Sequence, residues 1–97
     1  MEIVNKTALD AAKKKYSDAR KAIDLWVKLM KEHSFSKIQD VQKIFPTADA
    51  VGTDKIYICF DIRGNRYRLI CQLEYEANIA LIHEFLTHAD YTHKYPH

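Results

Sequence analysis

The hydrophobic pattern of this chain changes its period after Gly52, and this change limits the possible folds more than any other feature. In the segment 18–33, Ile23, Trp26 and Met30 recur at helical spacing and form the apolar stripe of a core-facing helix. After Gly52, the segments "KIYICFDI" and "YRLICQLEY" alternate between apolar and polar residues, which is typical of half-covered β-strands. Helices that precede a run of strands indicate an α+β fold.

The remaining segments complete the expected architecture. Met1–Val4 is short and β-prone and can form an edge strand, while Thr7 is placed to cap a helix over 8–16. The stretch "SKIQ" fits a capping box that opens a third, short helix ahead of Pro46. The turns "RGNR" and "EAN" divide the second half into a three-stranded antiparallel meander that ends in "IALIHEFLTH". We therefore expect N-terminal helices packed on one face of a twisted, mainly antiparallel sheet.

Length and composition suit one domain that spans residues 1–97, because 97 residues with 47% hydrophobic side chains can build a core. No apolar run approaches the roughly 20 residues that cross a bilayer, and the N-terminus lacks the pattern of a signal peptide. A cytoplasmic protein without membrane contact is expected. Cys59 and Cys71 lack the spacing of metal ligands, so neither a metal nor another cofactor is expected.

The first hairpin has a register that its turn predicts. If Gly64 and Asn65 form a two-residue loop, Ile62 faces Tyr67 and the apolar set of both strands packs on the helices. Three cross-strand pairs then lie on the other face: Asp61 with Arg68, Tyr57 with Gln72, and Lys55 with Glu74. The same register places the two cysteines on opposite faces, which excludes a disulfide between them.

The second hairpin is assigned a three-residue loop, because slipping by one residue would bury Glu84. The residues then expected on the core side are Ile79, Leu81, His83 and Phe85. Those expected on the outer side are Ala80, Ile82, Glu84 and Leu86, followed by His88. In this register His83 is interpreted as a hydrogen-bonded core histidine.

The outer face of the predicted sheet gathers groups that suit an anionic substrate: Lys55, Tyr57, Arg68, Glu84 and His88. Arginine binds phosphate through two donors, and histidine moves a proton near neutral pH. Cleavage of RNA without a metal needs a base for the 2′-OH, a cation for the phosphorane and an acid for the 5′-oxygen. A solvated face with cross-strand salt bridges is the alternative interpretation of the same residues.

Basic residues are clustered in two regions. Most lysines lie between residues 6 and 43, and Arg63, Arg66 and Arg68 lie close together in the second half. Such clusters can supply phosphate contacts, but the net charge of +2 does not by itself indicate a nucleic-acid partner. A solvated helix face with a polar hairpin turn explains the same distribution.

Three segments carry a resemblance to a known family: "FPTAD", "DKIYICFDIRGNRYRLI" and "IHEFLTHADY". Over 45–91 the chain resembles the HigB toxins, which are RelE-like ribonuclease toxins of bacterial type II toxin–antitoxin systems. The resemblance implies a metal-independent, ribosome-dependent mRNA endonuclease that acts through the 2′-OH. It leaves a 2′,3′-cyclic phosphate and a 5′-hydroxyl. It also implies mRNA on the ribosome as substrate, a HigA-like helix-turn-helix antitoxin as partner, and contact with operator DNA only through that antitoxin.

The resemblance also implies roles for individual residues. The expected catalytic set is Arg68 as the phosphate cation, His88 as general base or acid, Tyr91 as a stacking or hydrogen-bonding group, and Glu84 as an orienting group. The expected substrate-binding set is Lys55, which the resemblance implies as a second cation, together with Tyr57 of the outer face and the clustered Arg63 and Arg66. This chain reads Asp90, Tyr91 and Thr92 where the family more often has Glu-Tyr-Asp, so it has a shorter acid and lacks one carboxylate.

Two other functions remain compatible with the residues. The first is a toxin of the same fold that acts by binding and has no nuclease chemistry. The second is a non-catalytic domain that binds RNA or protein through a merely polar face.

Overall fold

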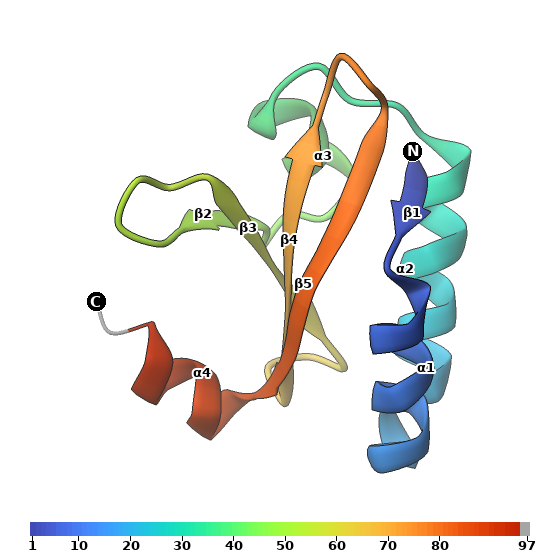
Figure 1. Ribbon diagram of the computed structural model, residues 1–97, viewed down its shortest axis with the longest axis vertical. Helices are drawn as coiled ribbons and strands as arrows, with labels where there is room; N and C mark the ends of the chain where they lie inside the picture. Colours follow the sequence, from blue (N-terminus) through green and yellow to red (C-terminus); the bar gives the residue numbers. More distant parts are fainter. Residues whose placement is uncertain (96–97) are drawn as a thin grey trace.

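The computed structural model describes residues 1–95. Its sheet has five strands in the order β1-β5-β4-β3-β2 (Figure 1). The strands are β1 (Glu2–Val4), β2 (Asp49–Val51), β3 (Tyr57–Ile62), β4 (Tyr67–Glu74) and β5 (Ile79–Thr87). The helices are α1 (Lys6–Lys15), the 3-10 turn η1 (Ser17–Ala19), α2 (Arg20–Glu32), α3 (Ile38–Ile44) and α4 (His88–Lys94). Only β1 pairs in parallel, with β5, so the predicted α+β fold with a mainly antiparallel sheet is confirmed.

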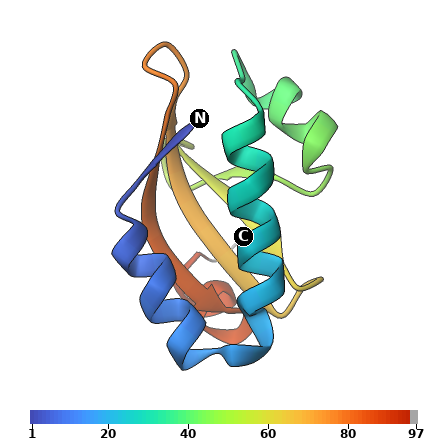
Figure 2. The same ribbon diagram turned by 90° about the vertical axis from the view of Figure 1, so that its right-hand side faces the viewer.

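The N-terminal helices cover one face of the sheet, as predicted. Figure 2 shows α1 and α2 in front of the strands and α4 behind them. The helix stripe of Ile23, Trp26 and Met30 is buried against the sheet, with 0–2% of each residue exposed. Phe60 of β3 lies at the centre, because the rings of Trp26 and Phe45 both meet it edge-on at 5.4 and 5.1 Å. Burial of these large side chains is the main stabilising term of the fold.

The predicted helix caps are wrong in detail. Thr7 lies inside α1, and its hydroxyl donates to Oδ1 of Asn5, the left-handed residue that precedes the helix. Ser36 does not cap α3 with its side chain. Its backbone N–H instead donates to the carboxylate of Asp40 at 3.1 Å. Short polar side chains near a helix start have several local partners, so sequence spacing does not choose among them.

The first hairpin has the predicted register. Ile62 pairs with Tyr67, and Asp61 pairs with Arg68 on the outer face. The expected pair of Lys55 with Glu74 is wrong, because β3 begins at Tyr57. The chain before Tyr57 instead contains the strand β2 and a loop, and β2 pairs antiparallel with β3. The sequence analysis did not predict β2.

The second hairpin contains a β-bulge that the sequence analysis missed. Cys71 of β4 pairs with Ile82, whereas the preceding Ile70 pairs with Glu84, so His83 is the extra residue in β5. Ala80 and Ile82 are therefore on the core side, with 0% and 2% exposed, and their predicted outward orientation was wrong.

Beyond the bulge the predicted faces hold. Phe85 packs against the main core, and Leu86 packs against a second cluster on the outer face. The predicted core positions of Leu81 and His83 were wrong. Leu81 is 39% exposed, and 42% of the His83 side chain is exposed, with its ring stacked on Tyr57 at 4.6 Å.

The two cysteines lie on opposite faces of the sheet, as predicted. Cys71 belongs to the main core between the sheet and the helices. Cys59 belongs to the second hydrophobic cluster, with Val51, Ile70 and Tyr91. Both thiols are free and buried.

Asp18 joins the helical layer to the turn of the first hairpin. Its carboxylate forms ion pairs with Arg63 and with Arg66, the second at 3.0 Å, and accepts a hydrogen bond of 2.6 Å from the hydroxyl of Tyr67. The Tyr67 hydrogen bond is the largest influence that lowers the pKa of Asp18, and the two arginines add to it. The negative charge of Asp18 is thus stabilised in the folded state.

We predict that Asp18→Asn lowers the Tm near neutral pH by roughly 2–5 °C. Since the folded pKa of Asp18 lies below its ordinary value of 3.8, its stabilising effect is complete above that pH and disappears as the pH falls through the folded pKa. The difference in Tm between the variant and the wild type should therefore vanish in strong acid. Thermal melts across pH measure this.

Asp24→Asn is the matched control, because Asp24 lies in α2 and forms an exposed ion pair with Lys13. Equal effects of the two substitutions would contradict the role assigned to Asp18.

Candidate active site

The outer face of the sheet is partly covered by a helix that the sequence analysis did not predict. Thr87 caps α4, because its hydroxyl accepts the N–H of Asp90 at 3.1 Å. The signal was present in the sequence as "THAD", a Thr followed three residues later by an acid. Tyr91 of α4 packs on Val51, Cys59 and Ile70, so α4 closes over the outer side of β2, β3 and β4.

Arg68 is held in place by four protein groups. Its Nε forms an ion pair with Oδ1 of Asp61 at 3.1 Å, and its Nη1 donates to the carbonyls of Asn65 and Tyr67 at 2.7 and 3.2 Å. Its Nη2 contacts Nδ1 of His88 at 3.0 Å. Only 11% of the side chain is exposed, so the guanidinium is an oriented cation with donor capacity left on Nη2 alone.

His88 is positioned by the start of α4. Its backbone N–H donates to the carbonyl of Arg66 at 2.8 Å, which fixes it beside the end of the first hairpin. A guanidinium can only donate, so Nδ1 of His88 must accept, and the proton of the neutral ring lies on Nε2. Arg68 and His88, which the sequence placed on the same face, are therefore in contact, and His88 is exposed to solvent.

Tyr91 lies beneath this pair. Its ring is 5.4 Å from the Arg68 guanidinium carbon, which is a cation–π distance. Burial raises the pKa of Tyr91 to about 12, and its contact with the Cys59 thiol adds to that shift. Its hydroxyl therefore stays protonated near neutral pH and is poorly suited to act as a base, whereas its ring lies against the Arg68 guanidinium.

Glu84 does not face Arg68 or His88. Its carboxylate accepts a 2.7 Å contact from Nζ of Lys94 and a 2.5 Å hydrogen bond from the Tyr95 hydroxyl. Burial alone would raise the pKa of Glu84, but these two partners outweigh it and the net pKa is lowered. Glu84 therefore fastens the end of α4 to β5, and sequence reasoning missed both of its partners.

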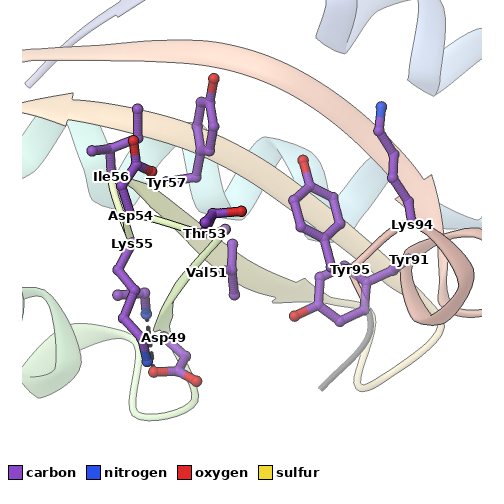
Figure 3. Close-up of a pocket in the computed structure, with 12 residues that line it drawn as sticks. Asp49, Val51, Thr53, Asp54, Lys55, Ile56, Tyr57, Tyr91, Lys94 and Tyr95 are labelled. Atoms are coloured by element: carbon purple, nitrogen blue, oxygen red, sulfur yellow. Dashed lines mark hydrogen bonds between the residues drawn. The ribbon is translucent and has the colours of Figure 1, made fainter.

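Lys55 and Tyr57 line a groove of about 710 Å³ between the β2–β3 loop and α4, here called the outer groove (Figure 3). Tyr91, Lys94 and Tyr95 line its other side. The outer groove adjoins the Arg68–His88 pair because Tyr91 contacts both.

Arg63 and Arg66 are not brought to this face. Both side chains turn to Asp18 at the helical layer, so the structure separates them from the other predicted substrate-binding residues. Three residues of the predicted site form one cluster, namely Arg68, His88 and Tyr91. Lys55 and Tyr57 lie in the adjoining groove. Glu84 lies apart from the cluster and binds the end of α4.

The chain matches a family model over residues 19–94. That model describes the HigB toxin, a RelE-like toxic component of a toxin–antitoxin system. The chain belongs to the HigB toxin family. Membership in the HigB family implies an antitoxin partner.

Individual HigB proteins are similar over nearly the whole chain. The mRNA interferase toxin HigB of Escherichia coli (strain K12) is 26% identical over 92 residues, which are 94% of this chain and 88% of that protein. The mRNA interferase HigB of Shigella flexneri has the same identity and coverage. That of Escherichia coli O6:H1 is 23% identical over 91 residues.

Two features are absent from residues 1–95 of this chain. None of the helices in that range has the length and apolar character needed to cross a membrane. No three His, Cys, Asp or Glu side chains in it are grouped so that they could hold a metal ion.

We predict that Glu84→Gln loosens α4 and leaves the sheet intact. The substitution removes a charged acceptor from Lys94 and Tyr95, and hydrogen bonds to charged groups contribute about 1.5–3 kcal/mol each. Amide hydrogen exchange of α4 should rise about tenfold or more, while the amides of β4 keep their protection. Glu76→Gln, in the exposed turn between β4 and β5, is the control. Unchanged exchange in α4 would show that Glu84 does not fasten the helix.

Proposed function

We propose that this chain is an mRNA endonuclease of a toxin–antitoxin system. The observation that carries the proposal is the 3.0 Å contact between Arg68 Nη2 and His88 Nδ1 on the solvent-open face of the sheet. An oriented cation can stabilise the phosphorane, and a neutral imidazole can accept the proton of the 2′-OH, which are two of the parts that metal-free cleavage needs. The names of the relatives, mRNA interferases, support the same substrate class.

In the proposed reaction, Arg68 binds a non-bridging oxygen of the scissile phosphate. Its Nη2 exchanges His88 for the phosphate, while the contacts to Asp61, Asn65 and Tyr67 keep the guanidinium in place. Preorganised charge of this kind stabilises the phosphorane because little reorganisation is needed as negative charge develops. The ring of Tyr91 limits the motion of Arg68 from below.

His88 carries the proton transfer. Once Nη2 of Arg68 donates to the phosphate, Nδ1 of His88 is free to accept the proton of the 2′-OH. The bond between the 2′-oxygen and phosphorus forms, the bond to the 5′-oxygen breaks, and the proton removed from the 2′-OH ends on the 5′-oxygen. The products are a 2′,3′-cyclic phosphate and a 5′-hydroxyl.

Membership in the family supports the partners that we propose for this activity. The substrate is mRNA engaged in the ribosome, which places the protein in the cytoplasm. The antitoxin is a HigA-like helix-turn-helix protein, and operator DNA is contacted through it alone. The departure of Asp90, Tyr91 and Thr92 from the more common family ending leaves the Arg68–His88 pair complete, because none of its contacts uses that acid.

We predict that Arg68→Ala and His88→Ala each reduce cleavage about 10²–10⁴-fold, the range for loss of a general acid–base group or a transition-state cation. Defined message is translated in a cell-free reaction, and new 5′ ends are mapped with and without ribosomes. Arg20→Ala is the control, because Arg20 lies on α2 and donates to the Lys13 carbonyl on the opposite face. Full cleavage by His88→Ala would remove His88 from the mechanism. Wild-type protein that is folded but yields no new ends would refute the nuclease function.

We predict different results for two substitutions of Tyr91. Tyr91→Phe keeps the ring and should retain activity within about threefold, whereas Tyr91→Leu should lose about tenfold, as expected for a cation–π contact. Because the pKa of Tyr91 is about 12, its hydroxyl stays protonated near neutral pH. The pH–rate profiles of Tyr91→Phe and the wild type should therefore have the same shape. A limb of the profile that is lost in Tyr91→Phe would make the hydroxyl a proton-transfer group.

A further inference from the structure

We propose that the outer groove is a nucleobase-binding subsite, which holds one base of single-stranded RNA next to the phosphate at Arg68. The proposal rests on the proposed nuclease function and specifies how its substrate is held. It assigns Tyr57 and Tyr95 as the two stacking walls. Tyr95 was not among the residues that the sequence pointed to.

Each wall of the outer groove is an aromatic pair. Tyr57 is backed by His83, with ring centroids 4.6 Å apart and an interplanar angle of 23°. Tyr95 is stacked on Tyr91, which also lines the groove, at 5.4 Å and also 23°. Figure 3 shows Tyr57 on one side of the groove and Tyr91 and Tyr95 on the other. Aromatic ring faces are the usual platforms on which the bases of single-stranded RNA stack.

The Tyr95 wall is fixed at its hydroxyl. That hydroxyl donates to Glu84 at 2.5 Å, and Glu84 also binds Lys94, so the ring is tied to β5 through Glu84. A prearranged ring loses little freedom when a base stacks on it. The volume of about 710 Å³ lies within the range of small-ligand sites, about 300–1,000 Å³.

The charges that line the outer groove indicate which part of a nucleotide it can bind. The charged residues that line it are Lys55, Lys94, Asp49 and Asp54, and their formal charges cancel. The groove therefore supplies no net attraction for a phosphate, whereas Arg68 beside it does. A neutral base between the rings, with its phosphate at Arg68, matches both features.

The backbone of the β2–β3 loop also shapes the groove. Gly52 has φ +92° and Lys55 has φ +58°, both in the left-handed region. A Cβ at position 52 would lie 3.4 Å from Cδ2 of Tyr57. The loop thus passes close to the Tyr57 ring, and this arrangement leaves the groove open between the loop and α4.

The test uses a short RNA that binds but cannot be cleaved. A trinucleotide with 2′-O-methyl riboses and a central 2-aminopurine is titrated into the full chain, and stacking is read as quenching of its fluorescence. We expect quenching with the wild type and with Tyr57→Phe. We expect about five- to hundredfold weaker binding with Tyr57→Leu, the range for loss of one base–aromatic stack.

A second variant guards against a folding defect in Tyr57→Leu. Thr53 is exposed and lines the groove, so Thr53→Trp should fill it and block the probe without touching the core. Glu76→Trp adds a tryptophan to the remote β4–β5 turn and should bind the probe like the wild type. Equal binding by wild type, Tyr57→Leu and Thr53→Trp, or no quenching by any of them, would overturn the subsite.

Cleavage mapping separates this inference from the nuclease proposal. If the wild type cuts messages and Tyr57→Leu cuts the same sites at the same rate, the subsite is refuted while the nuclease function stands. If the probe binds as expected but no message is cut by the wild type, the base site stands and the nuclease function fails.

Discussion

The outward direction of Glu84 and the inward direction of Phe85 depend on one extra residue in β5. With His83 bulged out, Ala80 and Ile82 fill the core before it and Phe85 fills it after. Without the bulge, strict alternation would bring Glu84 to the core side together with Ile82, at the cost of burying a carboxylate. Glu84 is instead free to hold Lys94 and Tyr95, so α4, and with it Tyr91 and His88, takes its place over the outer face. The bulged His83 in turn backs Tyr57 at the edge of the outer groove.

Arg68 connects this helix to the hairpin. A guanidinium that is 11% exposed needs partners for its donors, and it finds them in Asp61 of β3, in two carbonyls of its own hairpin and in His88 of α4. The same contacts that satisfy a nearly buried charge also aim it. Rigidity at Arg68 and a replaceable partner at His88 are what a phosphate site requires, since only the His88 contact must be given up to substrate.

The short helix α4 is the least self-sufficient element near the site. A helix of seven residues is not stable by itself in water. It is held by the Thr87 cap, by packing of Tyr91 and by the clamp at Glu84. His88, which carries the proposed proton transfer, and the Tyr91–Tyr95 wall of the outer groove therefore depend on the same tertiary contacts.

The sequence by itself determined the two periodic halves, the first hairpin and the outward position of Arg68. These depend on local alternation and on the turn at Gly64, which act over a few residues. It also carried the family resemblance and placed Arg68 and His88 on the same face of the sheet, where the structure brings them into contact. The Thr87 cap was readable as well, although it was missed.

Only the tertiary structure decided the bulge, the strand β2, the pairing of Arg63 and Arg66 with Asp18, and the outer groove. The run "IALI" is apolar on both faces, so its alternation cannot show where a strand shifts its register. Arg63 and Arg66 are charged enough to bind phosphate, but their carboxylate partner lies 45 and 48 residues away in the chain. Partners at such separations are chosen by how the layers pack, and no local pattern records that choice.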